Sequence, residues 1–156
     1  MTLPLPDPVA RLVSAGVDVG RTAQAFPFVT VDADGFPHVA LVSGRETGVG
    51  ADGSLLVALG SPTTRANLLR SGRATLVAVD GETAHSVKLV LRRSVDAEAL
   101  LGVVLDVSSH KADSVGVELS AISYVPTEAL ASLERWDRSA RVLALLVNEG
   151  RAPGAR

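Results

Sequence analysis

A polar segment, GSPTTRANLL at residues 60–69, gathers the side chains of this sequence that are best suited to holding an anion. Ser61 is a typical helix cap and Pro62 suits the first helical position, while Gly72 is typical of a helix end. The start of a helix presents unpaired backbone N–H groups and the positive end of the helix dipole. The segment therefore predicts a helix whose first turn can bind a phosphate group.

The residues just after the predicted cap would strengthen such a site. Thr63 and Thr64 add hydroxyl groups, and Arg65 adds a guanidinium group that can contact two phosphate oxygens at once. The alternative is a capped helix whose arginine points into water.

Other kinds of site have less support in the sequence. The absence of cysteine excludes disulfides, thiolate catalysis and iron–sulfur chemistry. His38, His85 and His110 lie far apart and lack the spacing of metal ligands, so no metal site is predicted. We find no paired carboxylates typical of a glycosidase and no nucleophile elbow, and we assign no catalytic residue.

Length and composition limit the kind of protein. With 156 residues, of which 47% are hydrophobic and 21% charged, the chain is expected to form one domain over 1–150 and a disordered tail at 151–156. A net charge of −2 and an aromatic content of 3% give little basis for binding nucleic acid. The chain shows no signal peptide and no apolar run long enough to cross a bilayer, so we expect a cytoplasmic protein that binds no membrane.

The elements that must position the polar segment are mostly strands. Six strands are expected, two of them around the turn DADG within 26–43 and the others at 54–60, 73–80, 83–94 and 114–125. Helices are expected at 7–16 with Asp7 as the cap, at 61–72, and after Pro126. Residues 44–53 are expected to form a loop, and residues 96–113 could form either strand or helix. Strands in hairpin order with one inserted helix predict an antiparallel barrel rather than a doubly wound sheet.

This order of elements resembles the FMN-binding split barrel of the pyridoxamine 5′-phosphate oxidase-like family. The segments that carry the resemblance are TVDADGFPHVALVS, DGSLLVALGSPTTRANLLRSGRATLVAVD and AHSVKLVLR, with a weaker likeness at LSAISYVPTEAL. The resemblance implies a mainly β fold, a six-stranded antiparallel split β-barrel with short peripheral helices. It also implies a homodimer with FMN in a groove between the two chains.

The resemblance further implies which residues contact the flavin. The start of the predicted helix would hold the FMN phosphate, the end of the third strand would give backbone contacts, and residues 40–43 would run along the isoalloxazine edge. The implied set is Leu41, Val42, Ser43, Ala58, Leu59, Gly60, Thr63, Thr64, Arg65, Asn67 and Ser86.

Three positions depart from the pattern of the authentic oxidases. Ala40 stands where they carry an arginine, Thr64 replaces one residue of a basic pair, and Ser86 stands where they carry a glutamine. Because the loss of one charge-assisted phosphate contact costs ~1.5–3 kcal/mol, we do not expect true pyridoxamine phosphate oxidase activity.

We therefore expect an FMN-binding flavoprotein oxidoreductase that passes electrons between a small-molecule donor and a small-molecule acceptor. A deazaflavin could replace FMN. One alternative is a non-catalytic module that holds a flavin or a haem, and haem would need His38, His85 or Tyr124 as its axial ligand. The other alternative is a ligand-free structural dimer. Tyr124 and Trp136 could cover the flavin groove or anchor the C-terminal helix to the barrel.

Overall fold

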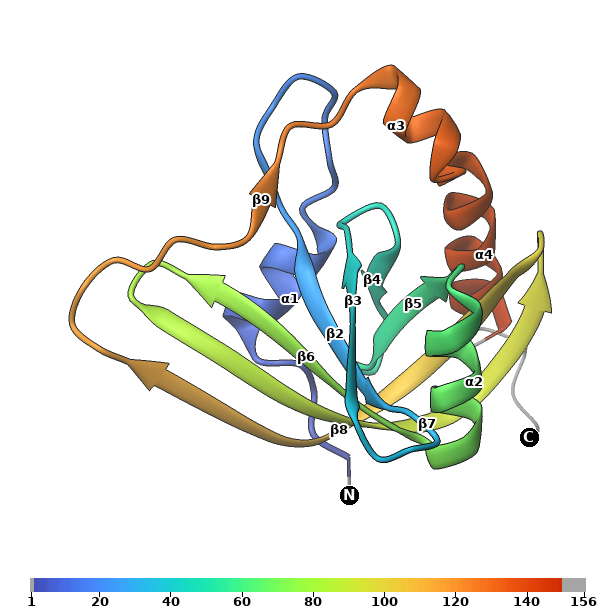
Figure 1. Ribbon diagram of the computed structural model, residues 1–156, viewed down its shortest axis with the longest axis horizontal. Coiled ribbons are helices and arrows are strands. Elements are labelled where there is room, and N and C mark those ends of the chain that lie inside the picture. Colours follow the sequence, from blue (N-terminus) through green and yellow to red (C-terminus); the bar gives the residue numbers. More distant parts are fainter. Residues whose placement is uncertain (1, 150–156) are drawn as a thin grey trace.

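One strongly curled antiparallel sheet organises the computed structural model, which describes residues 2–149 (Figure 1). Its seven strands lie in the order β3-β2-β6-β7-β8-β5-β4. Their bounds are β2 Phe26–Val31, β3 Pro37–Val42, β4 Thr47–Val49, β5 Leu55–Leu59, β6 Arg73–Asp80, β7 Thr83–Ala97 and β8 Leu100–Ser114. A separate two-stranded sheet pairs β1 (Ala23–Gln24) with β9 (Ser123–Tyr124).

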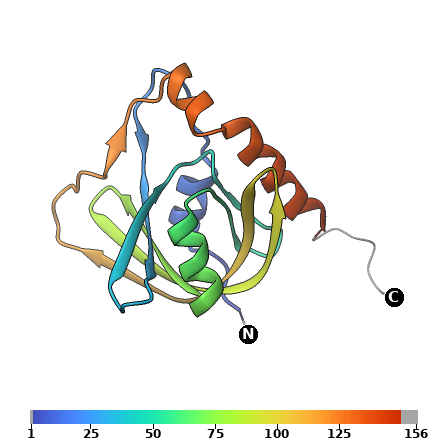
Figure 2. The same cartoon turned by 45° about the vertical axis from the view of Figure 1, so that its right-hand side comes forward.

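Four helices lie in the described part of the chain. They are α1 (Asp7–Ser14), α2 (Pro62–Ser71), α3 (Glu128–Leu133) and α4 (Trp136–Glu149). Of these, α1, α2 and α4 pack on the curled sheet, and α3 packs on α4. Helices α1 and α2 add Val9, Val13 and Leu68 to the core inside the curl, and α2 stands across its open side (Figure 2). None of the helices in the described part of the chain has the length and apolar character needed to cross a membrane.

Strand β5 is buried on both faces, as the apolar segment 54–60 predicts. Leu55, Val57 and Leu59 belong to the core inside the curl. Leu56 and Ala58 face the other way, where β5 and β8 meet α4. The period of two along a strand thus divides one apolar run between two layers.

The longest elements are β7 and β8, which pair along their whole length around a tight turn. Glu98 and Ala99 form this turn with φ angles of 57° and 62°. Register shifts at Lys88/Leu89 and at Leu91/Arg93 interrupt the ladder. Such irregularities bend and twist a strand pair, which helps the sheet to curl. Residues 96–113 are therefore strand apart from this turn.

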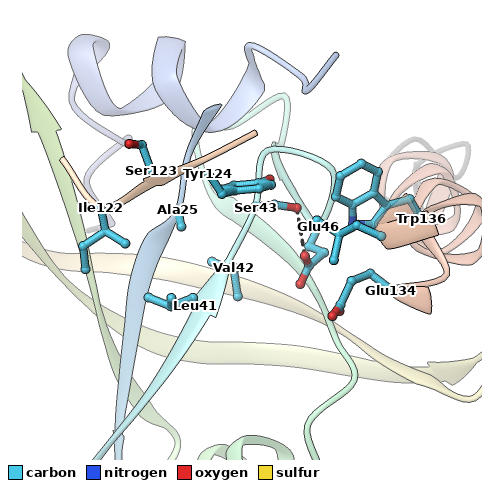
Figure 3. Close-up of a pocket in the computed structure, with 11 residues that line it drawn as sticks. Ala25, Leu41, Val42, Ser43, Glu46, Ile122, Ser123, Tyr124, Glu134 and Trp136 are labelled. Atoms are coloured by element: carbon cyan, nitrogen blue, oxygen red, sulfur yellow. Dashed lines mark hydrogen bonds between the residues drawn. The ribbon is translucent and has the colours of Figure 1, made fainter. Parts of the chain in front are cut away.

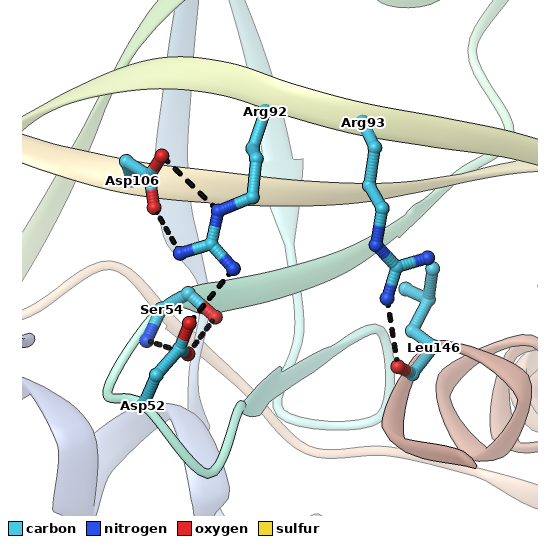
Figure 4. A network of polar contacts seen from close by, with 6 residues as sticks. All are labelled: Asp52, Ser54, Arg92, Arg93, Asp106 and Leu146. Carbon is cyan, nitrogen blue, oxygen red and sulfur yellow. Dashed lines mark hydrogen bonds and ion pairs between the residues drawn. The ribbon is translucent and has the colours of Figure 1, made fainter. Parts of the chain in front are cut away.

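Ion pairs join β7 to its surroundings (Figure 4). Arg92 pairs with Asp106 on the neighbouring β8 and, at 2.7 Å, with Asp52 in the loop before β5. The hydrogen bond from the Ser54 hydroxyl, together with Arg92, lowers the pKa of Asp52 to about 2. Arg93 donates to the Leu146 carbonyl of α4 at 3.0 Å. The middle of β7 is thus tied to both a loop and a helix.

Several predicted boundaries are confirmed. Ser61 caps α2, and Gly72 ends it in the left-handed region with φ of 68°. Strand β6 spans 73–80 as predicted. The turn at Gly35, with φ of 88°, joins β2 to β3. These elements are marked by local cap and turn residues.

Other sequence predictions are wrong in detail. The described residues hold nine strands, not six. The three that the prediction did not include are the short strands β1 and β4 and the long strand β8, which lies in the segment left open as strand or helix. The cap of α1 is Pro6, and Asp7 is the first helical residue. Residues 44–53, expected as a loop, contain β4. Of 114–125 only Ser123–Tyr124 form a strand apart from the end of β8, because Val115 and Val117 are exposed and build no buried face. The predicted tail at 151–156 lies outside the described residues.

The contact between β8 and α4 leads to a stability prediction. A Cβ atom at Gly102 would lie 2.7 Å from Val142 Cγ1 and 3.2 Å from Val95 Cγ1. Both neighbours are stiff β-branched side chains, so Gly102→Ala is expected to lower the free energy of unfolding by ~1–3 kcal/mol in urea denaturation. Gly48→Ala is the matched control, since its nearest contacts would be at 4.0 Å. Equal stability of the two variants would contradict this packing of α4.

Candidate functional site

The start of α2 offers fewer anion-binding groups than its sequence suggests. Ser61 Oγ accepts the Thr64 N–H at 3.4 Å, and Pro62 has no N–H. The Thr63 N–H remains as the backbone donor that an anion could use, and the Thr63 side chain is exposed beside it. Thr64 instead faces inward, and its buried hydroxyl finds no hydrogen-bond partner in the described chain.

Arg65 is held at the turn between β7 and β8. Its guanidinium pairs with Asp96 at 3.2 Å and donates to the Ala99 carbonyl at 3.5 Å. The Asp96 side chain is 81% exposed. Exposed ion pairs contribute ~0–1 kcal/mol, less than the ~1.5–3 kcal/mol of a charge-assisted contact with a well-placed anion. A phosphate at this position could therefore displace Asp96.

Asn67 has a structural partner. Its Nδ2 donates to Thr30 Oγ1 at 3.1 Å, and its Oδ1 accepts from Arg70 at 3.3 Å. Both Asn67 and Thr30 are buried. The pair joins α2 to β2 and so fixes how the helix stands across the curl.

The end of β3 and the end of β5 meet at Glu46. Ser43 Oγ donates to Glu46 Oε1 at 2.8 Å, and the Glu46 carbonyl accepts from the Ala58 N–H at 2.8 Å. From Ala58 the chain continues through Leu59 and Gly60 into α2. One arc thus joins the predicted contacts on β3, on β5 and at the start of α2.

Ser86 is the predicted residue that lies apart from this arc. It sits in β7 opposite Val77 and Lys111. It is ten residues before Asp96, the partner of Arg65, which corresponds to about 33 Å along a strand.

A pocket of about 270 Å³ opens beside the arc, between β3, the β1–β9 pair and the helices α3 and α4 (Figure 3). Its walls are mostly apolar, with contributions from Leu41, Val42, Ile122 and Leu130. Its polar lining residues are Ser43, Glu46, Ser123, Tyr124, Glu134 and Trp136. Leu41, Val42 and Ser43 are thus shared between the predicted flavin contacts and this pocket.

Glu46 is the acidic centre of the pocket. Burial raises the pKa of Glu46 to about 7, and nearby Glu134 adds to this rise, while the hydrogen bond from Ser43 opposes it. In Figure 3 the two carboxyl groups extend into the same region below Trp136. Glu46 therefore changes charge near neutral pH.

Tyr124 and Trp136 bring two buried donors to the pocket. The Tyr124 hydroxyl and the Trp136 indole N–H have no hydrogen-bond partner of normal geometry in the described chain. Burial raises the pKa of Tyr124. The indole N–H is close enough to favour the charged form of Glu46, and Arg45 lies 5.9 Å from the centre of the Trp136 ring.

The fold also pairs two histidines that are distant in sequence. His85 and His110 stack with ring centres 5.1 Å apart, and Nδ1 of His85 lies 2.9 Å from Nε2 of His110. Burial lowers the pKa of His85. Within residues 2–149, no third metal-binding side chain joins them to form a metal-binding group. His38 lies elsewhere, on β3 opposite Thr30.

The sequence has no matching family model and no matching curated protein. Solved structures do share the fold. An FMN-binding protein from Syntrophomonas wolfei subsp. wolfei has a TM-score of 0.54 at 13% identity, over 70% of this chain and 86% of that chain. HupZ from Group A Streptococcus has a TM-score of 0.54 at 14% identity, over 74% of this chain and 99% of that chain. The styrene monooxygenase flavin reductase from Pseudomonas putida S12 has a TM-score of 0.52 at 11% identity, over 66% of this chain and 88% of that chain.

The fold of this chain is therefore that of the FMN-binding split-barrel proteins, and the resemblance drawn from the sequence is confirmed at the level of the fold. The sequence prediction did not include Glu46 and Glu134 in the site. It weighed a groove role against a packing role for Tyr124 and Trp136 and favoured packing for Trp136, and the structure places both in the pocket wall.

The raised pKa of Glu46 predicts how stability changes with pH. The folded carboxyl has a pKa of about 7 against an ordinary value of 4.5, so the folded state binds the proton more tightly. The free energy of unfolding should therefore fall as pH rises from about 4.5 to 7. Glu46→Gln is expected to match the native chain near pH 5 and to exceed it at pH 8 by ~2–3 kcal/mol in urea denaturation. Glu128→Gln, an exposed change on α3, is the control, and parallel pH profiles for Glu46→Gln and the native chain would refute the prediction.

Proposed function

We propose that this chain binds FMN and acts as an oxidoreductase, passing electrons between a small-molecule donor and a small-molecule acceptor. The observation that carries the proposal is the arc from the end of β3 through β5 to the start of α2, set in a split-barrel fold. Structures that share this fold include an FMN-binding protein and a flavin reductase.

The residues of the arc fit the parts of FMN. The Thr63 N–H and hydroxyl and the Arg65 guanidinium together suit one phosphate group. Strand β3 ends the sheet, so one side of its backbone faces no strand in the described chain. Backbone groups on that side could bond to the polar edge of an isoalloxazine ring.

The bound flavin would supply the hydride and electron chemistry, while the chain binds and orients it. A site of this kind needs no acid–base pair of its own, which agrees with the absence of a catalytic motif in the sequence. A carrier that holds flavin without turnover would use the same residues, and only turnover with a donor and an acceptor separates the two functions.

The proposed flavin groove also calls for a second copy of the chain. Val39 and Leu41 on the edge strand β3 are 57% and 53% exposed, and both point to the same side. Val31 and Phe36, at the other end of the β2–β3 hairpin, are exposed as well. An exposed apolar row on an edge strand is a typical contact surface. We propose that two chains pair through it.

Flavin retention tests the proposed function. After incubation with FMN and gel filtration, the chain is expected to keep a flavin absorption spectrum. Arg65→Ala should weaken FMN binding at least ~10-fold with an unchanged melting temperature, because it removes a charge-assisted phosphate contact. Asp96→Asn should strengthen binding, because it frees Arg65. Arg11→Ala on α1 is the control, because it removes the same charge away from the proposed site. A parallel titration with a deazaflavin tests the alternative cofactor. A chain that retains no flavin would show that the turn at 61–67 is only a helix cap.

The oligomeric state gives a separate test. Sedimentation velocity is expected to show a dimer for the native chain and a shift toward monomer for Val39→Lys, because a buried lysine would lack a partner for its charge. Ala140→Lys, on the exposed side of α4, adds the same charge and should leave the dimer intact. A monomeric native chain would contradict the pairing.

A further inference from the structure

The pocket beside β3 contains two donors that the described chain leaves unsatisfied. Trp136 is only 7% exposed, and its indole N–H has no hydrogen-bond partner. The Tyr124 hydroxyl is buried and unpartnered as well. Native proteins rarely leave buried donors unpaired. Glu46 lies near the indole N–H and Ser43 lies near the Tyr124 hydroxyl. Neither contact has the geometry of a normal hydrogen bond, so both groups can still bond to an acceptor group of a ligand in the pocket.

An acceptor of hydrogen bonds lies next to these donors. Glu46 uses Oε1 to accept from Ser43, and its carboxyl group faces the pocket with Glu134 beyond it (Figure 3). In a ligand whose acceptor group contacts Tyr124 and Trp136, the atom next to that acceptor would therefore lie against this carboxyl group. The ionised form of this carboxyl group only accepts hydrogen bonds, so it favours a donor such as an N–H at that atom.

The other walls of the pocket indicate the size and polarity of the rest of the ligand. Leu41, Val42, Ile122 and Leu130 form apolar walls around a space of about 270 Å³. Such walls favour a small ring with one polar edge over a flexible polar chain.

We propose that this pocket binds a planar cyclic amide or imide, with its C=O accepting from Tyr124 and Trp136 and its adjacent N–H donating to Glu46. An organic cation is the competing ligand class, because two carboxyl groups line the pocket. The indole N–H of Trp136 can only donate, however, and it would point its hydrogen at a cation. The raised pKa of Glu46 also leaves part of its population neutral at pH 7.

This ring edge has two possible sources. It could belong to a separate small molecule, or it could be the pyrimidine ring of a flavin, whose C=O and N–H groups alternate. The second source rests on the proposed function, since Leu41, Val42 and Ser43 are common to the pocket and to the predicted flavin contacts.

The chain provides its own probe for the experiment. Trp136 is the single tryptophan of the sequence, so fluorescence excited at about 295 nm reports on the pocket directly. Thymine has the proposed C=O and N–H edge without the rest of a flavin. Its control compound is 1,3-dimethylthymine, which keeps the C=O groups and has no N–H group. Riboflavin carries the edge on a flavin without phosphate, with 3-methylriboflavin as its match, and its own fluorescence reports its binding.

We expect the unmethylated member of at least one pair to bind and its methylated match to bind at least ~10-fold more weakly, because methylation removes the hydrogen bond to the second carboxyl oxygen of Glu46. Tyr124→Phe should weaken the binding of that compound by about 5- to 10-fold at an unchanged melting temperature. Glu128→Gln, outside the pocket, should change nothing. Binding of thymine identifies a separate ligand, and binding of riboflavin alone identifies the flavin ring.

The proposal is overturned if neither thymine nor riboflavin binds, if the methylated compounds bind as well, or if Tyr124→Phe has no effect. Failure of the proposed function looks different. In that case FMN is not retained, while thymine still binds and depends on Tyr124. Arg65→Ala separates the two sites further, since it should weaken FMN binding and leave thymine binding unchanged.

Discussion

The hairpin of β7 and β8 is the element to which the other layers of the molecule attach. Its strands of 15 residues each lie between β6 and β5, and α4 packs on its outer side. Its turn places Glu98 and Ala99 in the left-handed region, which costs residues with a side chain ~1–2 kcal/mol each. Arg141 of α4 bonds to Glu98 at 3.1 Å, and Arg65 of α2 reaches the Ala99 carbonyl. Side chains of α2 and α4 thus both reach this turn.

The sequence reveals the fold wherever local residues mark an element. Helix α2 has typical cap residues at both ends, Ser61 and Gly72, and strand β6 lies between Gly72 and a turn at Gly81. The turn at Glu98 and Ala99 carries no such mark, because neither residue favours a positive φ angle. That is why residues 96–113 could not be assigned from the sequence. The tertiary contacts that stabilise the turn come from two distant helices.

The arc and the pocket also differ in how far the sequence reveals them. The part of the arc at residues 58–65 is continuous in sequence, so its polar groups could be recognised before the structure was known. The pocket joins Glu46, Tyr124 and Trp136, which come from three separate parts of the chain. Their meeting depends on the pairing of β1 with β9 and on the positive φ of 55° at Arg135, between α3 and α4. Neither feature has a sequence pattern long enough to predict.

The two edges of the curled sheet are not equivalent. Strand β4 has three residues, and α1 covers it, with the Thr47 hydroxyl donating to the Val13 carbonyl at 2.8 Å. Strand β3 has six residues and carries the exposed Val39 and Leu41. In the proposed dimer, a two-fold axis would turn the β3 edge of one chain toward the same edge of its partner. Such a contact uses the same surface on both chains, so association through β3 would close at two chains and would not continue into a fibre.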